Sequence, residues 1–141
     1  MSFTATGSDT HYRFVLVNAS AGTYQISLSD TTLYSAAWST GTGYATYYSL
    51  KNTTGATING TLTLFTTSGS VASAVSFAIS KNATYSTNTM ALGTGVNQTG
   101  TAMFVHDGPP GAVLAESDIA NFNTTPAYVQ PVKFVAARAI R

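Results

Sequence analysis

The chain has 141 residues, a net charge of +1 and only 8% charged residues, whereas 44% of its residues are hydrophobic. An average soluble domain carries roughly 25% charged residues, so this surface must be wetted largely by Ser and Thr hydroxyls. The length predicts a single domain, residues 1–141, and the hydrophobic content excludes a chain that stays disordered for want of a core. The six basic residues are scattered, which excludes the basic stripe that nucleic-acid binding requires.

The cellular location has to be judged from composition. No apolar run approaches the roughly 20 residues of a membrane-spanning helix, so we expect no membrane insertion. Residues 1–7 have neither the charged nor the apolar part of a signal peptide, and the absence of Cys excludes disulfides and thiolate metal sites. The low charge and high Thr content are typical of extracellular β-domains. We therefore expect an extracellular or cell-surface protein whose signal peptide is not part of this chain.

Apolar residues alternate with small or polar residues in period two, which predicts short β-strands. In residues 71–79 the odd positions are mostly large and the even positions are Ala or Ser, so one face should be buried and the other flat. Gly, Asn and Pro mark turns between the strands. The strands are expected at residues 12–16, 24–28, 44–51, 61–67, 71–79, 84–90, 101–106, 112–120 and 129–137.

No helical periodicity is present to supply the crossover connections of a parallel sheet. The sequence therefore predicts an all-β fold, an antiparallel β-sandwich of about eight to ten strands, either immunoglobulin-like or jelly-roll-like. Residues 106–111 read as a hairpin-like loop, and Pro131 indicates an edge strand or the start of one. The expected core comprises Phe14, Leu16, Ile26, Leu62, Leu64, Val75, Phe77, Phe104, Val113, Leu114 and Phe134.

Six Asn-x-Ser/Thr sequons occur, at Asn18, Asn52, Asn59, Asn82, Asn97 and Asn123. They are open to two interpretations. Such sites accept N-linked glycans in a secretory pathway. Asn and Thr are also favoured in turns and at strand ends, and this second interpretation is the simpler one in a chain so rich in Thr.

Two segments resemble known proteins. Residues 44–90 contain a strand that ends in an Asn-Thr turn at Asn52, followed by the Thr-Leu-Thr-Leu strand at 61–64 and a Ser-Gly turn. This resembles the pattern of bacterial immunoglobulin-like surface modules. Residues 104–115, which include His106-Asp107-Gly-Pro-Pro-Gly111, resemble a segment that recurs in secreted bacterial proteins of unassigned function. The likeness covers about half the chain and implies a fold and a location, without catalytic residues.

Aromatic residues form the best candidate ligand site. Tyr and Trp faces exposed on β-modules serve as platforms for sugar rings, and five such residues fall within fifteen positions. Tyr44 and Tyr48 should share one face of a strand, with Tyr47 on the other. The alternative is a core Trp surrounded by Tyr side chains whose hydroxyls reach water. The candidate platform consists of Tyr34, Trp38, Tyr44, Tyr47 and Tyr48.

Other site chemistry is poorly represented. Glu116 and Asp118 lie two apart on an expected strand, so they share a face, and with His106 they are the weak candidates for a metal site. Zinc requires three or four ligands of this kind, and a third His does not exist. The chain also lacks a nucleophile-elbow motif. We therefore expect no catalytic residues, no metal and no cofactor.

These observations favour a non-enzymatic extracellular structural or adhesive module. Its uncharged edge strands would pair with neighbouring copies, because charge is the usual guard against such pairing. The partners expected are further copies of the chain or another surface protein. The alternative function is a carbohydrate-binding module that uses the Trp and Tyr platform for a glycan.

Overall fold

The computed structural model describes residues 30–136 of the chain, and these residues form eight β-strands. The predicted strands at 12–16 and 24–28 lie outside the described residues. Within the described range, no helix is long and apolar enough to cross a membrane. The strands are β1 (Leu33–Ser39), β2 (Tyr44–Asn52), β3 (Ile58–Thr66), β4 (Val71–Ile79), β5 (Thr84–Asn88), β6 (Thr99–His106), β7 (Val113–Asn121) and β8 (Tyr128–Ala136).

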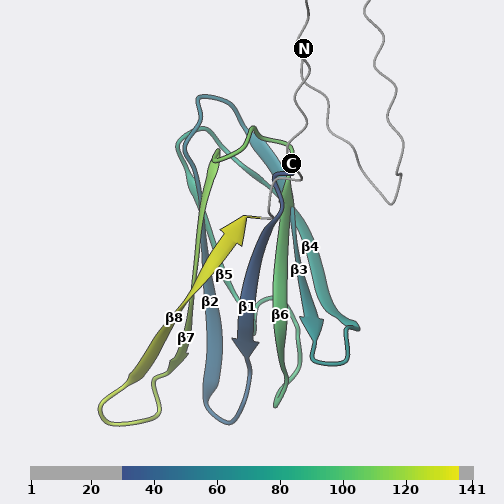
Figure 1. The fold of residues 1–141 in the computed structure, drawn as a ribbon. Helices are drawn as coiled ribbons and strands as arrows, with labels where there is room; N and C mark the ends of the chain where they lie inside the picture. The colour runs from purple at the N-terminus through teal and green to yellow at the C-terminus, as the bar shows by residue number, and fades with distance from the viewer. Residues whose placement is uncertain (1–29, 137–141) are drawn as a thin grey trace, which may run out of the picture.

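The strands form one antiparallel sheet in the order β4-β3-β6-β1-β8-β7-β2-β5. Only β3 with β4 and β7 with β8 are neighbours both in the chain and in the sheet, so the other connections cross between distant strands. The sheet curls until its two ends approach each other, which makes the domain nearly closed and barrel-like (Figure 1). The predicted all-β antiparallel fold is confirmed, although no clean break divides the ladder into two sheets.

β8 joins the two halves of the sheet by changing its partner along its length. Its first six residues pair with β7, from Asn121↔Tyr128 to Glu116↔Lys133, and its last three pair with β1. Pro131 lies in the part of β8 that has β7 as its neighbour, opposite Asp118. Because proline lacks the N–H that a second neighbour would need, it suits a strand with one open side. β8 is not an edge strand of the sheet, so the expectation for Pro131 is correct only locally, where β8 has a single neighbour.

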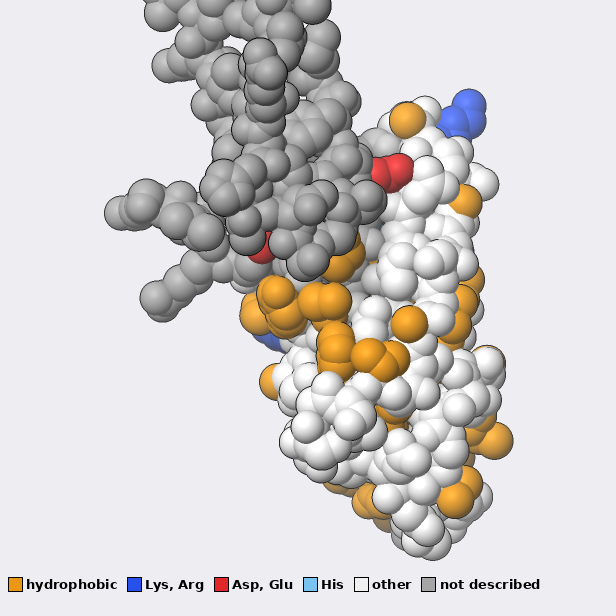
Figure 2. All heavy atoms as spheres, turned by 90° about the vertical axis from the view of Figure 1, so that its right-hand side faces the viewer, with side chains coloured by type: hydrophobic (Ala, Val, Ile, Leu, Met, Phe, Trp, Pro, Cys, Tyr) orange, Lys and Arg blue, Asp and Glu red, His pale blue; other side chains and the backbone are white. Residues whose placement is uncertain are grey.

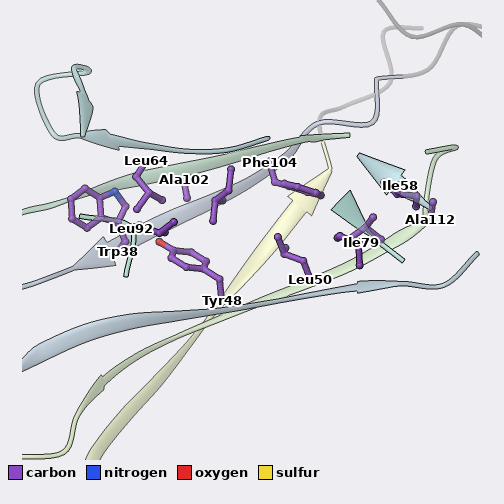
Figure 3. Close-up of a cluster of buried hydrophobic side chains, with 12 residues drawn as sticks. Trp38, Tyr48, Leu50, Ile58, Leu64, Ile79, Leu92, Ala102, Phe104 and Ala112 are labelled. Carbon is purple, nitrogen blue, oxygen red and sulfur yellow. The ribbon is translucent and has the colours of Figure 1, made fainter. Parts of the chain in front are cut away.

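The core fills the space inside the curled sheet. Figure 3 shows its side chains between facing strands, from Trp38 at one end to Ile58 and Ala112 at the other, with Tyr48, Leu50 and Phe104 between them. Burying a side chain of this size contributes roughly 1.5–3 kcal/mol.

Most of the predicted core residues are found inside. Leu62, Leu64, Phe104 and Val113 are buried, and Val75, Phe77 and Phe134 pack against them while partly exposed. Leu114 corrects the prediction, because it is 61% exposed. Its neighbour Val113 points inward, and successive residues of a strand point to opposite faces. The predicted core residues Phe14, Leu16 and Ile26 lie outside the described residues.

Side chains close the seam between β4 and β5, the two ends of the sheet. Phe77 of β4 stacks on Tyr85 of β5, with ring centroids 3.7 Å apart and planes inclined by 8°. Ser73 donates a hydrogen bond from its Oγ to the carbonyl oxygen of Leu92, in the loop that follows β5, at 2.7 Å. Among the described residues, β4 has a backbone ladder only with β3, and β5 only with β2. Each end strand therefore has one edge that no other described strand covers.

Two details of the chain path differ from the sequence prediction. β1 was not expected as a strand, because a register shift between Ser35 and Trp38 interrupts the period of two there. Residues 106–111 were expected to close a hairpin, but β6 and β7 are not neighbours in the sheet. The loop instead carries the chain from one half of the sheet to the other. Asp107 anchors it by accepting hydrogen bonds from the backbone N and the side-chain Nδ2 of Asn59, both at 2.8 Å.

Asn52 shows what one of the sequons does in the fold. Its side chain is fully buried, and its Nδ2 donates to the carbonyl oxygens of Ala56 and Ile79 at 2.7 and 2.9 Å. Its Oδ1 accepts from the backbone N of Thr54 at 2.8 Å. Asn82 and Asn97 adopt positive φ angles of 54° and 56°, as turn residues do. At these three positions the sequon residues act in turns, and Asn52 is inaccessible for glycosylation in the folded state.

Gly100 provides the sharpest test of the packing. A Cβ atom at this position would lie 1.7 Å from the carbonyl oxygen of Phe65, which is backbone and has no room to yield. We expect Gly100→Ala to lower the free energy of unfolding by about 3 kcal/mol or more, measured by urea denaturation. Gly55→Ala is the matched control, because nothing lies within 4 Å of the added atom. Equal stability of the two variants would contradict the close approach of β3 and β6.

Candidate binding surfaces

Trp38 is a core residue and presents no face to solvent. Its side chain is 1% exposed. The indole Nε1 donates to the carbonyl oxygens of Phe65 at 2.9 Å and Thr101 at 3.0 Å, so its one polar atom is satisfied inside the protein. A buried Trp with its N–H paired is the ordinary structural use of this residue. The sugar platform expected from sequence therefore lacks its central residue.

Tyr48 is also buried, and it lies on the inner face of β2 together with the half-buried Tyr44, as predicted. Its ring meets that of Phe134 edge to face, with centroids 6.2 Å apart. The Tyr48 hydroxyl has no hydrogen-bond partner among the described residues, and burial raises its pKa well above the ordinary value. Tyr48 therefore stays neutral and contributes to packing rather than to a surface.

Tyr47 is the member of the candidate set that faces solvent from β2. It is 38% exposed, and its ring meets that of Phe122 edge to face, with centroids 5.9 Å apart. Phe122 is 64% exposed and lies in the loop between β7 and β8. Phe122 was not predicted as a site residue, although an aromatic residue inside a polar turn indicates an exposed ring. Tyr47 and Phe122 form an exposed aromatic pair.

Tyr34 lies apart from this pair, on the outer face of β1. In the ladder it stands between Met103 of β6 and Val135 of β8. Tyr34 is 43% exposed and Val135 is 61% exposed, so the three residues form an apolar row across the outside of the sheet. The five residues of the candidate platform are thus divided: two are buried, one is half-buried, and two are exposed on different strands.

The weak metal candidates do not converge. Glu116 and Asp118 share the outer face of β7, as predicted, and stand opposite Ser49 and Tyr47 in the ladder. His106 ends β6 and is buried. Within residues 30–136, no three His, Cys, Asp or Glu side chains gather closely enough to hold a metal ion.

His106 has a structural environment of its own. Its ring lies 5.5 Å from that of Phe104, its backbone oxygen accepts a hydrogen bond from the Thr31 hydroxyl at 2.9 Å, and its Nδ1 has no partner among the described residues. Burial lowers the pKa of His106, and the nearby Asp107 carboxylate and a hydrogen bond to the backbone of Gly108 oppose this shift only in part. The folded state therefore favours the neutral imidazole.

Comparison with known proteins adds no further constraint. No protein-family model, no curated protein and no solved structure matches this chain. Any proposal of function must therefore rest on the residues and geometry described above.

The buried imidazole predicts a pH dependence of stability. Below the ordinary His pKa of about 6.5, the unfolded chain takes up a proton that the folded chain resists. The free energy of unfolding should therefore be highest above that pH, fall as the pH is lowered through it, and level off below the folded-state pKa. Urea denaturation at several pH values between about 5.5 and 7.5 measures the slope. His106→Gln should flatten it, whereas an unchanged slope in that variant would contradict the assignment.

Proposed function

We propose that this protein is a non-enzymatic extracellular structural or adhesive module that associates with further copies of itself through its strand edges. The observation that carries the proposal is the seam: β4 and β5 meet through side chains, and each keeps a backbone edge that no described strand covers. An open edge offers a row of N–H and C=O groups to any extended chain that can approach it.

The chemistry of the surface supports this proposal. In Figure 2, which shows the right-hand side of Figure 1, the described residues present mostly white polar and backbone surface, with orange hydrophobic patches and few charged atoms. The row of Tyr34, Met103 and Val135 adds an apolar strip to the outside of the sheet. A surface with few charges has little long-range repulsion between copies, so close association meets little electrostatic resistance.

The fold is consistent with a jelly-roll-like module, which is the finer assignment that we propose. Three pairings are nested: β1 with β8, β2 with β7, and β3 with β6. A long hairpin rolled up on itself produces such nested pairs, and this is the principle of a jelly roll. The sequence likeness to bacterial immunoglobulin-like surface modules points to the same extracellular setting.

Self-association is the direct test of this proposal. Sedimentation velocity over a wide concentration range should show larger species at higher concentration. The association should persist at high salt, because few charges are present to be screened. A chain that stays monomeric at every concentration would contradict the proposal.

A carbohydrate-binding role is the second candidate, and the exposed pair of Tyr47 and Phe122 favours it. Two accessible aromatic rings side by side offer the apolar faces on which sugar rings pack. Asp118 stands opposite Tyr47 in the ladder and adds a hydrogen-bond acceptor for sugar hydroxyls. The candidate binding surface is therefore narrower than the sequence suggested, with Phe122 in the place of Trp38.

The glycan alternative predicts that polysaccharides retain the protein and that Phe122→Ala weakens this retention at least tenfold without loss of fold. Stacking of a nucleobase on one aromatic side chain is worth about 1–3 kcal/mol, and we take the same order of magnitude for a sugar ring on Phe122. Pull-down with insoluble polysaccharides measures retention. Tyr34→Ala removes an exposed ring from a different strand and should have no effect. Retention that is absent, or equal in both variants, would eliminate this alternative.

A further inference from the structure

We propose that β4 is the edge through which two copies associate, as an antiparallel β4·β4 pair about a two-fold axis at Val75, the middle residue of the strand. This inference rests on the proposed function and specifies its surface, its partner and its symmetry. The partner is a second copy of this chain.

The free edge of β4 carries no charge. The strand runs for nine residues, Val71–Ile79, and contains no Asp, Glu, Lys or Arg. Natural proteins usually guard an edge strand with a charge, a proline, a bulge or a very short length. A strand of nine residues extends roughly 30 Å. β4 therefore offers a long and largely unguarded row of backbone donors and acceptors, interrupted only by a register shift near its start, opposite Leu64 and Phe65.

The other open edges are guarded. β5 has only five residues, Thr84–Asn88, which limits any ladder built on it. The part of β8 that pairs only with β7 contains Pro131, which lacks an N–H, and Lys133, which is charged. Of the open edges among the described residues, β4 is thus the longest, and its one interruption is the register shift near Val71.

The side chains of β4 fit a contact between identical strands. Val75 and Phe77 turn toward the core, where Phe77 stacks on Tyr85, while Ala74, Ser76 and Ala78 are exposed and small. A two-fold axis at Val75 places Ala74 of one copy opposite Ser76 of the partner subunit. Such a two-fold interface uses the same surface patch on both copies. It is stable only if the side chains of this patch do not repel the identical patch of the partner subunit. An uncharged strand with a small-residue face meets that condition.

A pair of charge variants tests this arrangement in the full chain. Ala74→Lys with Ser76→Lys places like charges opposite each other twice across the proposed axis, and Ala74→Glu with Ser76→Glu does the same with the opposite sign. Like charges directly opposite in a ladder are destabilising, so each double variant alone should associate at least tenfold more weakly than the wild type. An equimolar mixture of the two should recover association, because every cross-strand pair then becomes attractive.

The control places the same charge elsewhere. Thr99→Lys with Thr101→Lys adds two lysines to exposed positions of β6, a strand flanked by β3 and β1. Ser76→Lys also removes a hydrogen bond between the Ser76 and Thr61 hydroxyls. Circular dichroism and thermal unfolding therefore check that each variant folds. Sedimentation velocity measures association in all samples, so folding and pairing are read separately.

The outcomes separate this inference from the function on which it rests. Loss of association in both β4 double variants, recovery in the mixture and normal association of the β6 control support the β4 pair. Association of the β4 variants that equals the wild type would overturn the β4 pair and leave the self-associating module intact. A monomeric wild type would contradict the proposed function itself.

Discussion

Phe77 and Tyr85 stack across the seam at which the two ends of the sheet meet, with ring centroids 3.7 Å apart. Phe77 also lies parallel to Phe104, at 5.8 Å, so the contact links the seam directly to the core. The stack holds the sheet in its curled form and shields one side of the core from water. Because side chains and not a backbone ladder make this closure, β4 and β5 each keep an edge that no other described strand covers. The nearly closed shape and the proposed pairing of β4 thus have one origin.

The scarcity of charged residues also matters inside the protein, where buried backbone carbonyl oxygens accept hydrogen bonds from side chains. Neutral side chains supply them. Asn52 links its own turn to the end of β4 through Ala56 and Ile79, and the indole of Trp38 caps two carbonyl oxygens at the far end of the core. Neutral hydrogen bonds avoid the large desolvation cost of buried charges. The same low content of charged residues leaves the surface with little electrostatic repulsion between copies.

Local alternation was enough to predict most strands, because each side chain of a strand reports which face is buried. The even and odd residues of β4 separate as expected, with Ala74, Ser76 and Ala78 outside. Where the rhythm breaks, prediction failed: the shift in β1 hid a strand, and the run Val113–Leu114 concealed which residue faces inward. Strand order could not be predicted, because most neighbouring strands in the sheet are far apart in the sequence. The change of partner along β8, from β7 to β1, is one example. Burial of Trp38 and exposure of Phe122 likewise depend on contacts between segments far apart in the sequence.

The central claim is that side chains, and not a backbone ladder, close the seam at β4. Hydrogen exchange of individual amides in the dilute protein measures this directly, because an amide in a ladder is protected and an amide at an open edge is not. The account predicts alternating behaviour along β4, with amides that face β3 protected and those that face the seam exchanging quickly, whereas β6 is protected throughout. Uniform protection of β4 in the monomer would contradict the account.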